Sequence, residues 1–405
     1  FESALYAHGG RFAAICFAGG AARCYLDPCG SLAVVFSSAQ QIAASTSSLI
    51  PYPGDREEDV NRELIAAMGI SEERTSYPFG LTPRRSVERL LPNHFLDLET
   101  WRAARHWPAG EIAMTGSVQA AVQEVASILK RNISAVARDF PLHMSLTAGR
   151  DSRMLLACVR DYVDAVVFFT HTVRGPGGRV DCQVAPKIAK RFGLSHMFLP
   201  FEKASEVEVE QWLYRTGHCV HGKIVHWVRS YKRLDQRRAV LIGAAGELGR
   251  GYHWRRGDTE ATPISADDLL VKVQSAITAQ TRDRAQHWLE SLPLKNSLTV
   301  WGLLYNEDFN GCWFGPVIYG FTHNASCIWP FCHRRVIEIM LSLPAEYRQS
   351  NLLPRDVVES LWPELLSLPF NWPMGLQRYI YAVKWRAEKI RKQIARLLGA
   401  RAPPP

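Results

Sequence analysis

The sequence has no apolar run long enough to cross a bilayer, because Arg, Asp or His interrupts each stretch before the roughly 18 residues that a span needs. It also lacks the Walker phosphate-binding pattern G-x-x-x-x-G-K-[ST], since Gly222-Lys223 is followed by Ile224. Its nine cysteines form no C-x-x-C pair, which argues against a structural zinc site. We therefore expect reduced core thiols in a cytoplasmic protein that does not enter a membrane.

Composition indicates a globular protein of two or three domains. Of the 405 residues, 47% are hydrophobic and 21% are charged, which excludes a disordered chain. The formal net charge is +9, and residues 381–405 carry seven basic side chains against one acidic one. This basic tail is either a solvated helix face or a surface for a partner or RNA. Phe1-Glu2-Ser3-Ala4-Leu5 has no signal-peptide pattern, and we expect the given chain to begin inside a longer protein.

Residues 1–115 have the pattern of an antiparallel β-rich domain. Short β-type runs at 11–17, 23–26 and 32–36 alternate with Gly and Pro turn signals, which predicts an antiparallel meander from 11 to 45. Residues 56–68 have a helical pattern, and the Pro-rich stretch 78–92 is typical of an extended connection.

From about residue 116 the pattern changes to that of a parallel α/β domain. Apolar residues recur at three- and four-residue steps from Val118 to Val136, which predicts a long amphipathic helix. A strand at 142–147, a helix at 152–162 and a strand at 165–170 then form a βαβ unit, which predicts a parallel sheet. Further elements are expected at 181–192 (helix), 197–199 and 239–242 (strands), and 265–290, 297–314, 333–343, 354–361 and 376–398 (helices). The domain is expected to span 116–380, mostly helical after Gly251, with a basic helical tail at 381–405.

The segment Ser145-Leu146-Thr147-Ala148-Gly149-Arg150-Asp151-Ser152 lies where a parallel strand passes into a helix, and ligands of open α/β sheets bind at such strand ends. Small residues let the backbone approach a phosphate, the N–H groups at the helix start face the anion, and the hydroxyls of Thr147 and Ser152 add donors. Asp151 adds an oxygen ligand of the kind that Mg²⁺ prefers. The pattern predicts a pyrophosphate cradle, although it also suits a plain turn in which Asp151 and Ser152 only cap the helix.

A second glycine-bearing turn follows the strand at 239–242. Its sequence, Leu241-Ile242-Gly243-Ala244-Ala245-Gly246-Glu247-Leu248-Gly249-Arg250-Gly251-Tyr252, resembles the L-S-G-x-G-x-D-E-x-F-G-G-Y signature of asparagine synthetases, β-lactam synthetases and lasso-peptide cyclases. The first turn resembles the PP-loop, S-G-G-x-D-S, of the N-type ATP pyrophosphatases, with Thr147 and Ala148 in place of the first serine and glycine. Two further segments resemble the glutaminase-type domain and the P-F-x-D segment of that family: Asp27-Pro28-Cys29-Gly30-Ser31 and Pro330-Phe331-Cys332-His333.

The resemblance implies a PP-loop synthetase domain preceded by a partial, glutaminase-like domain of the Ntn-hydrolase type. Such enzymes activate a carboxylate as its acyl adenylate, release pyrophosphate, and let ammonia or an amine form an amide, lactam or macrolactam. The substrates would be a small-molecule or peptide carboxylate and a nitrogen donor, without nucleic acid, and a homo-oligomer is left open. Carried over by motif, ATP would be bound by Leu146, Thr147, Ala148, Gly149, Asp151, Ser152 and Gly243, with Mg²⁺ held by Asp151 and Glu247.

The chain departs from the family pattern in its acidic and basic residues. The acid pair of the second turn is reduced to Glu247, and an upstream family glutamate falls on Ala244. The family lysine after the last helix is missing, so Arg355 is the nearest cation that could act catalytically by stabilising the leaving pyrophosphate. Glu247 also suits the lesser role of a helix-start carboxylate, and Arg355 equally suits a surface cap or ion pair. A glutaminase would need an N-terminal cysteine, which this segment does not show.

Other residues carry weaker signals. Asp181 is expected to cap a helix, or else to contact the nucleotide or a residue that binds it. Phe168 and Phe169 either pack in a core strand or flank adenine. Tyr305 and Glu307 match only part of a Y-x-E-x-R pattern in the relatives.

Two alternatives to an amide-forming synthetase fit the same motifs. A PP-loop enzyme that adenylates a tRNA base would use the basic tail as its nucleic-acid surface. A degenerate relative would bind nucleotide or a partner protein without catalysis, because the family lysine and one acid are missing.

Overall fold

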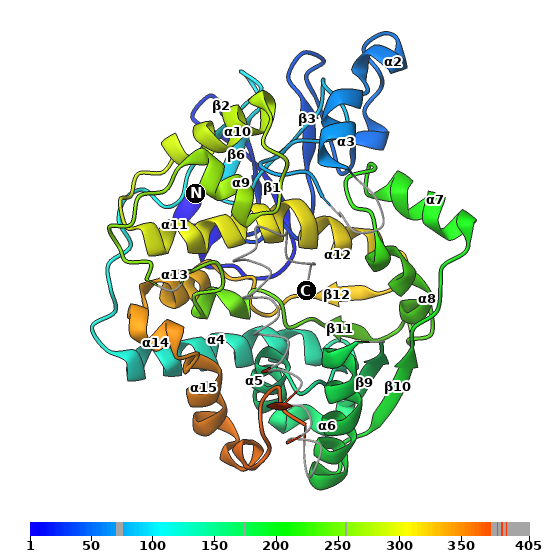
Figure 1. The fold of residues 1–405 in the computed structure, drawn as a ribbon, viewed down its shortest axis with the longest axis vertical. Coiled ribbons are helices and arrows are strands. Elements are labelled where there is room, and N and C mark those ends of the chain that lie inside the picture. The colour runs from blue at the N-terminus through cyan, green and yellow to red at the C-terminus, as the bar shows by residue number, and fades with distance from the viewer. Residues whose placement is uncertain are drawn as a thin grey trace.

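The structure is a computed structural model that describes residues 1–69, 76–173, 175–255 and 257–373, together with residues 379, 382, 383 and 386. Its class is α/β, as predicted. In Figure 1 the N-terminal strands lie at the top, helices α11 (Ser297–Leu304) and α12 (Gly315–Phe321) cross the middle, and a parallel sheet lies below them. No helix within the described ranges is both long and apolar enough to pass through a bilayer. The helix expected at 376–398 and the basic tail fall almost entirely outside the described residues.

The parallel sheet has five strands in the order β10-β9-β8-β11-β12, which confirms the predicted parallel sheet. Its strands are β8 (Leu142–Ser145), β9 (Val166–Thr172), β10 (His196–Pro200), β11 (Ala239–Leu241) and β12 (Ser326–Ile328). Ala239 of β11 pairs with Leu142 of β8 on one side and with Ser326 of β12 on the other. Because β8 and β11 are direct neighbours and run parallel, the two turns that follow them leave the sheet at the same edge.

Helices cover both faces of this sheet. They are α4 (Val118–Ala137), α5 (Arg150–Cys158), α6 (Pro176–Phe192), α7 (Glu206–Arg215), α8 (Trp227–Lys232) and α12, with the 3-10 segments η2 (Arg160–Ala165) and η3 (Lys223–His226). Side chains alternate along a strand, so Phe168 packs in the core on the α4–α6 side and Phe169 in the core on the α7, α8 and α12 side. Both rings are fully buried, so they are core residues of the sheet.

Side-chain caps start four of the six later helices that the structure describes. The six are α9 (Ala266–Lys272), α10 (Ala279–Glu290), α11, α13 (Arg334–Ser342), α14 (Ala345–Gln349) and α15 (Leu353–Leu361), followed by η6 (Pro363–Ser367). Of these, α9, α10, α11 and α13 begin at such a cap. The single helix predicted at 265–290 is wrong: the backbone turns left-handed at Gln274 (φ 56°), and Thr278 starts a new helix by accepting the N–H of Thr281. The helix predicted from Asp181 begins earlier, at Pro176, because proline suits the first helical position.

The helix predicted at 297–314 extends further and changes its pitch. Between α11 and α12 the chain forms a π-helical segment, η5 (Tyr305–Phe314). Such wide turns are rare in proteins, and many of those that occur lie at functional sites. Here Tyr305, Glu307 and Asp308 leave the segment in different directions to three buried partners: the Glu247 carboxylate, the Arg105 guanidinium and the Phe79 N–H.

Asp308 gives the fold a measurable pH dependence. Its carboxylate accepts the Phe79 N–H, at 2.7 Å, and a hydrogen bond from the Cys312 thiol, but burial outweighs both and raises its pKa to about 7. The folded state therefore keeps a proton that the unfolded state loses near pH 4, so stability falls as pH rises from about 4 to about 7. We expect Asp308→Asn, which keeps the acceptor oxygen, to flatten this fall in urea unfolding at pH 5 and pH 8. The exposed Asp283→Asn is the control, and an unchanged slope in Asp308→Asn would contradict the assignment.

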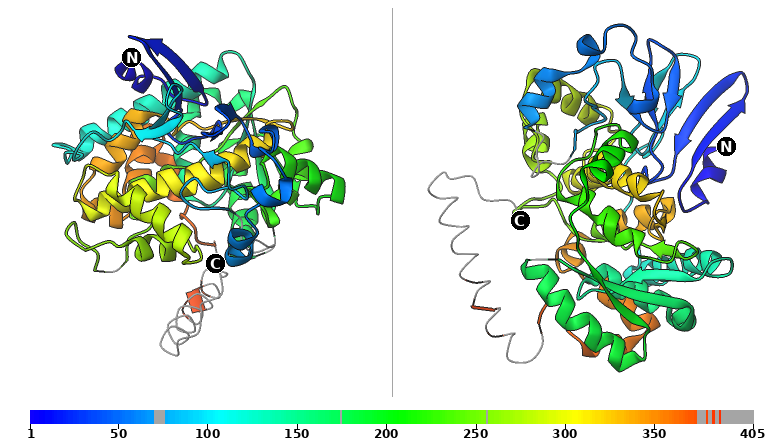
Figure 2. Two further views of the ribbon diagram at one scale, coloured as in Figure 1. Left: turned by 90° about the horizontal axis from the view of Figure 1, so that it is seen from above. Right: turned by 90° about the vertical axis from the view of Figure 1, so that its right-hand side faces the viewer.

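The N-terminal third forms two small antiparallel sheets, ordered β1-β2-β6-β7 and β4-β3-β5. Its elements are α1 (Glu2–Tyr6), β1 (Ala13–Ala18), β2 (Ala21–Leu26), β3 (Val35–Ser37), β4 (Ile42–Ala44), η1 (Ser47–Leu49), α2 (Arg56–Asp59), α3 (Arg62–Met68), β5 (Glu88–Arg89), β6 (His94–Asp97) and β7 (Arg102–Arg105). The hairpin of β1 and β2 projects from the body of the molecule (Figure 2).

The antiparallel meander predicted for residues 11–45 is wrong in its third strand, which pairs with β4 and β5 and not with β2. The turn after β2 explains the difference. The buried Asp27 carboxylate accepts the backbone N–H groups of Cys29, Ser31 and Leu32, and Gly30 takes a left-handed conformation (φ 64°). This turn directs the chain away from β2, whose free edge pairs with β6 instead.

Candidate functional site

The two glycine-bearing turns meet at the carboxyl edge of the parallel sheet. The first joins β8 to α5, and the second joins β11 to the 3-10 segment η4 (Gly246–Gly249). A methyl group at Gly246 would overlap with Asp151 Oδ1 and would lie 2.8 Å from its Cγ, so only glycine fits there. A Cβ at Gly243 would lie 3.6 Å from Asp151 Cβ, which is ordinary contact. Asp151 therefore packs directly against the second turn.

The first turn is closed by its own hydrogen bonds. Thr147 Oγ1 lies 2.6 Å from Ser152 Oγ and accepts the Gly149 N–H at 2.9 Å. The Ala148 N–H donates to Asp181 Oδ1 at 2.8 Å. The N–H groups of Ala148 and Gly149, which would face an anion, are thus already bonded. The N–H groups in the first turn of α5 have no partner within their own helix. These remain the donors that the turn can offer to a phosphate.

Leu146 and Asp181 both support the first turn from the protein side, and for Asp181 this matches the expected contact behind the nucleotide site and not the capping role. The Leu146 side chain is fully buried in the core, and its backbone bonds to Phe169 O and to the Thr170 hydroxyl, so it anchors the turn. Asp181 lies one turn inside α6 and does not cap that helix; its carboxylate crosses to Ala148. Asn371 also contacts the turn, through its N–H to Ala148 O at 2.8 Å, and no sequence signal indicated this residue.

The second turn contains one residue in a strained backbone conformation and is held by hydrogen bonds from a tryptophan and a buried tyrosine. Ala245 takes a left-handed conformation (φ 70°), which favours glycine. The Trp329 indole N–H donates to Ala244 O, and the Tyr305 hydroxyl donates to Glu247 Oε2 at 2.9 Å. Burial and the nearby Glu247 carboxylate hold the pKa of Tyr305 well above its usual range, so the hydroxyl stays a donor. Glu247 is therefore oriented from its own turn and from the π-helical segment.

Arg250 lies between the two carboxylates. Its Nη2 is 2.5 Å from Asp151 Oδ2 and 3.2 Å from Glu247 Oε1, and all three side chains are at least three-quarters buried. Burial, and then the neighbouring Glu247 carboxylate, raise the pKa of Asp151 above its ordinary value, although Arg250 opposes this. The residue stands inside the second motif, but its role is visible only in the structure.

This arrangement does not fit a resident Mg²⁺ ion. Asp151 and Glu247 offer oxygens from two strand ends, which is suitable donor chemistry, but Mg²⁺ needs ligands at about 2.1 Å in near-ideal octahedral geometry. The Arg250 guanidinium takes the space between the two carboxylates. Among the described residues no group of three or more His, Cys, Asp or Glu side chains is placed to hold a metal ion.

Arg355 lies on the first turn of α15, where its side chain is exposed. A Cβ at Gly249 would overlap with Leu353 Cδ2, so α15 begins against the second turn, two residues before Arg355. Within the described part of the chain, no hydrogen bond or ion pair joins Arg355 to Asp151 or Glu247.

Glu307 is held in a buried network of hydrogen bonds that serves the fold. Its fully buried carboxylate receives two hydrogen bonds from Arg105, at 2.6 and 2.8 Å, one from Asn93 at 2.6 Å and one from the Trp288 indole at 2.7 Å. These bonds satisfy the carboxylate completely and tie η5 to β7. Tyr305, its partner in the partial Y-x-E pattern, points instead to Glu247.

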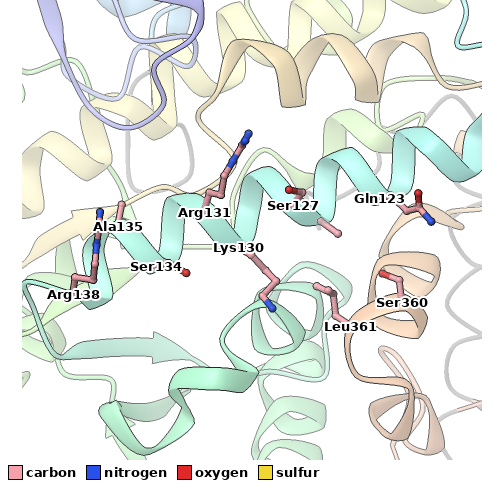
Figure 3. Close-up of a pocket in the computed structure, with 10 residues that line it drawn as sticks. Gln123, Ser127, Lys130, Arg131, Ser134, Ala135, Arg138, Ser360 and Leu361 are labelled. Carbon is pink, nitrogen blue, oxygen red and sulfur yellow. The ribbon is translucent and has the colours of Figure 1, made fainter.

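A cavity of about 820 Å³ lies between α4 and α15, away from both turns (Figure 3). Lys130 and Ser127 line it from α4, and Ser360 and Leu361 face them from α15. The Lys130 ammonium is paired with Asp161 at 2.9 Å. The cavity shares no residue with the two turns, so it offers no part of a common site with them.

Comparison with the models of known protein families finds no match for this chain, and no curated protein matches it significantly. The geometry of the two turns therefore carries the functional argument.

Proposed function

We propose that the chain is an ATP-dependent, amide-forming synthetase of the asparagine synthetase type, acting in the cytoplasm. One observation carries this proposal: Asp151 and Glu247, 96 residues apart, meet on one guanidinium above neighbouring parallel strands. In this proposal the parallel sheet belongs to a PP-loop domain, and the N-terminal sheets belong to a partial Ntn-hydrolase-like domain.

The site has the chemistry that a nucleotide polyphosphate needs. The first turn of α5 offers N–H groups that have no partner within their own helix and the positive end of that helix, and Thr147 and Ser152 add hydroxyls. The position of Ala245 is glycine in the L-S-G-x-G pattern, and Ala245 adopts the left-handed conformation that glycine favours. The turn therefore keeps the shape associated with the motif although the residue differs.

In the proposed reaction a substrate carboxylate oxygen attacks the α-phosphorus of ATP, and the bond to the β-phosphate breaks to release pyrophosphate. The nitrogen of ammonia or an amine then attacks the activated carbonyl carbon, AMP leaves, and the nitrogen loses a proton. Glu247 orients Arg250 toward the phosphates, and Arg355 stabilises the leaving pyrophosphate if its exposed side chain turns toward the site. No step of this scheme requires a metal ion held by the protein.

The test is ATP–pyrophosphate exchange with a panel of carboxylic acids that includes amino acids and short peptides. We expect one class of acid to support the return of labelled pyrophosphate into ATP without any amine, because adenylation precedes amide formation. If none of the acids supports exchange, and ADP is the only nucleotide product, the result would contradict this function.

A second function, nucleotide binding without catalysis, is favoured by one observation. Arg355, the nearest cation in place of the missing family lysine, is exposed, and within the described residues no hydrogen bond or ion pair joins it to Asp151 or Glu247. Calorimetry with α,β-methylene-ATP separates the two functions: binding of this analogue without exchange for any acid supports the second.

A further inference from the structure

One nitrogen of Arg250 stands where a bridging cation would stand. The residue follows η4 in extended conformation, and its backbone N–H returns to Glu247 O at 2.9 Å. The side chain then turns back so that Nη2 contacts both Asp151 and Glu247. A single atom between carboxylates from two strand ends is the relation that a divalent ion has to its ligands.

The surroundings hold this guanidinium in place. The side chains of Arg250 and Asp151 are only 15% and 14% exposed. The contact of Gly246 with Asp151 fixes one carboxylate, and the Tyr305 hydroxyl fixes the other. Because both acids are positioned from outside, they hold the guanidinium between them.

Two polar atoms of this group lack a partner. Asp151 Oδ1 and Arg250 Nε are both buried and make no hydrogen bond within the described part of the chain. An orphaned guanidinium N–H calls for an anionic oxygen, and a guanidinium binds phosphate through parallel N–H donors. The site thus already contains the cationic half of a phosphate contact.

We infer that Arg250 takes the place of the divalent cation in this site, so that the protein binds a nucleotide polyphosphate without needing Mg²⁺. The nucleotide part of this inference rests on the proposed function. The metal part does not, because it concerns only which cation the two carboxylates accept. Removing the guanidinium leaves two facing carboxylates, whose repulsion a divalent cation can relieve in competition with protons.

The first experiment measures Mn²⁺ binding by electron paramagnetic resonance, without nucleotide. We expect the wild type to show no Mn²⁺ site that depends on Asp151. We expect Arg250→Gln to gain one such site, at least about tenfold tighter than any binding to the wild type, and to lose it when Asp151→Asn is added. Arg237→Gln, which removes an exposed arginine paired with Asp235, is the matched control and should gain nothing.

The second experiment measures binding of α,β-methylene-ATP by calorimetry, in EDTA and in Mg²⁺. We expect the wild-type dissociation constant to change by less than about threefold and that of Arg250→Gln to weaken more than about tenfold in EDTA. Binding of the analogue to the wild type only in Mg²⁺ would overturn the inference while leaving the proposed function intact. Failure to bind under either condition would instead remove the proposed function.

Even if the analogue does not bind, the Mn²⁺ experiment decides whether Arg250 takes the place of a divalent cation. One Mn²⁺ bound to the wild type and lost in Asp151→Asn would overturn the inference even if Arg250→Gln does not fold. A folded Arg250→Gln variant, judged by circular dichroism, that gains no Mn²⁺ would overturn it as well.

Discussion

Asp151→Asn is expected to lower ATP–pyrophosphate exchange at least about hundredfold, because electrostatic and positioning groups of this kind have effects of that size. Asparagine keeps the shape of the side chain and its fit against Gly246, but it does not bear the charge that holds Arg250 at 2.5 Å. The guanidinium would then pair with Glu247 alone and leave its position above β8 and β11. The rate with a saturating carboxylic acid is the measurement, since the loss should appear in the chemical step.

A companion variant moves Asp151 without removing it. In Gly246→Ala the added methyl group would overlap with Asp151 Oδ1, so exchange should fall in the same direction. Gly116→Ala, at a glycine with open space around it, and Asp164→Asn, at an exposed carboxylate, are the matched controls. Exchange within about threefold of the parent in folded Asp151→Asn would rule out the site, given the size of such effects.

The meeting of the two turns could be predicted from the sequence because it follows from the sheet. Each turn comes directly after a strand of the parallel sheet, and all such strands end at one edge. What the strand order does not determine is where long side chains point. Arg250 and Asp181 were both visible in the sequence, yet their contacts, with Asp151 and with the Ala148 N–H, depend on distances between separate elements.

The errors in the fold have the same origin. Periodicity correctly indicated a helix at 297–314 but not the π-helical turns of η5, in which Glu307 and Asp308 bond to partners far away in the chain. The third strand of the expected meander left its neighbour because the Asp27 carboxylate captured the backbone N–H groups that follow it. Long-range polar contacts of this kind leave no periodic trace in the sequence.

Seven of the nine cysteines are buried, in agreement with the prediction of core thiols, whereas Cys16 and Cys182 are half-buried. Burial raises the pKa of Cys158 to about 12, although the positive charge of Lys130 acts in the opposite direction. Such a thiol stays protonated and acts as a small apolar side chain. The buried cysteines thus contribute to packing, while the chemistry of the site belongs to carboxylates and arginines.

Glu307→Gln is expected to have the largest effect on stability, about 3–5 kcal/mol of the free energy of unfolding, because it breaks a buried ion pair from one side. The Arg105 and Glu307 side chains are 6% and 0% exposed and share two hydrogen bonds. Glutamine keeps the size of the side chain, but its single acceptor oxygen can serve only one of Asn93 and Trp288, which donate to different oxygens of Glu307. The loss therefore reports the uncompensated Arg105 charge together with one lost hydrogen bond. Urea unfolding followed by tryptophan fluorescence is the measurement.

The exposed pair of Arg335 and Glu124 supplies the contrast, since its side chains are 47% and 42% exposed and its distance of 2.7 Å is almost the same. Glu124→Gln should cost less than about 1 kcal/mol, because solvent screens such a pair. Adding Arg105→Met to Glu307→Gln should restore part of the stability, since the buried charge is then gone. Equal costs for Glu307→Gln and Glu124→Gln would show that β7 and η5 are not held together by this ion pair, and the π-helical turn that also places Tyr305 on Glu247 would need another cause.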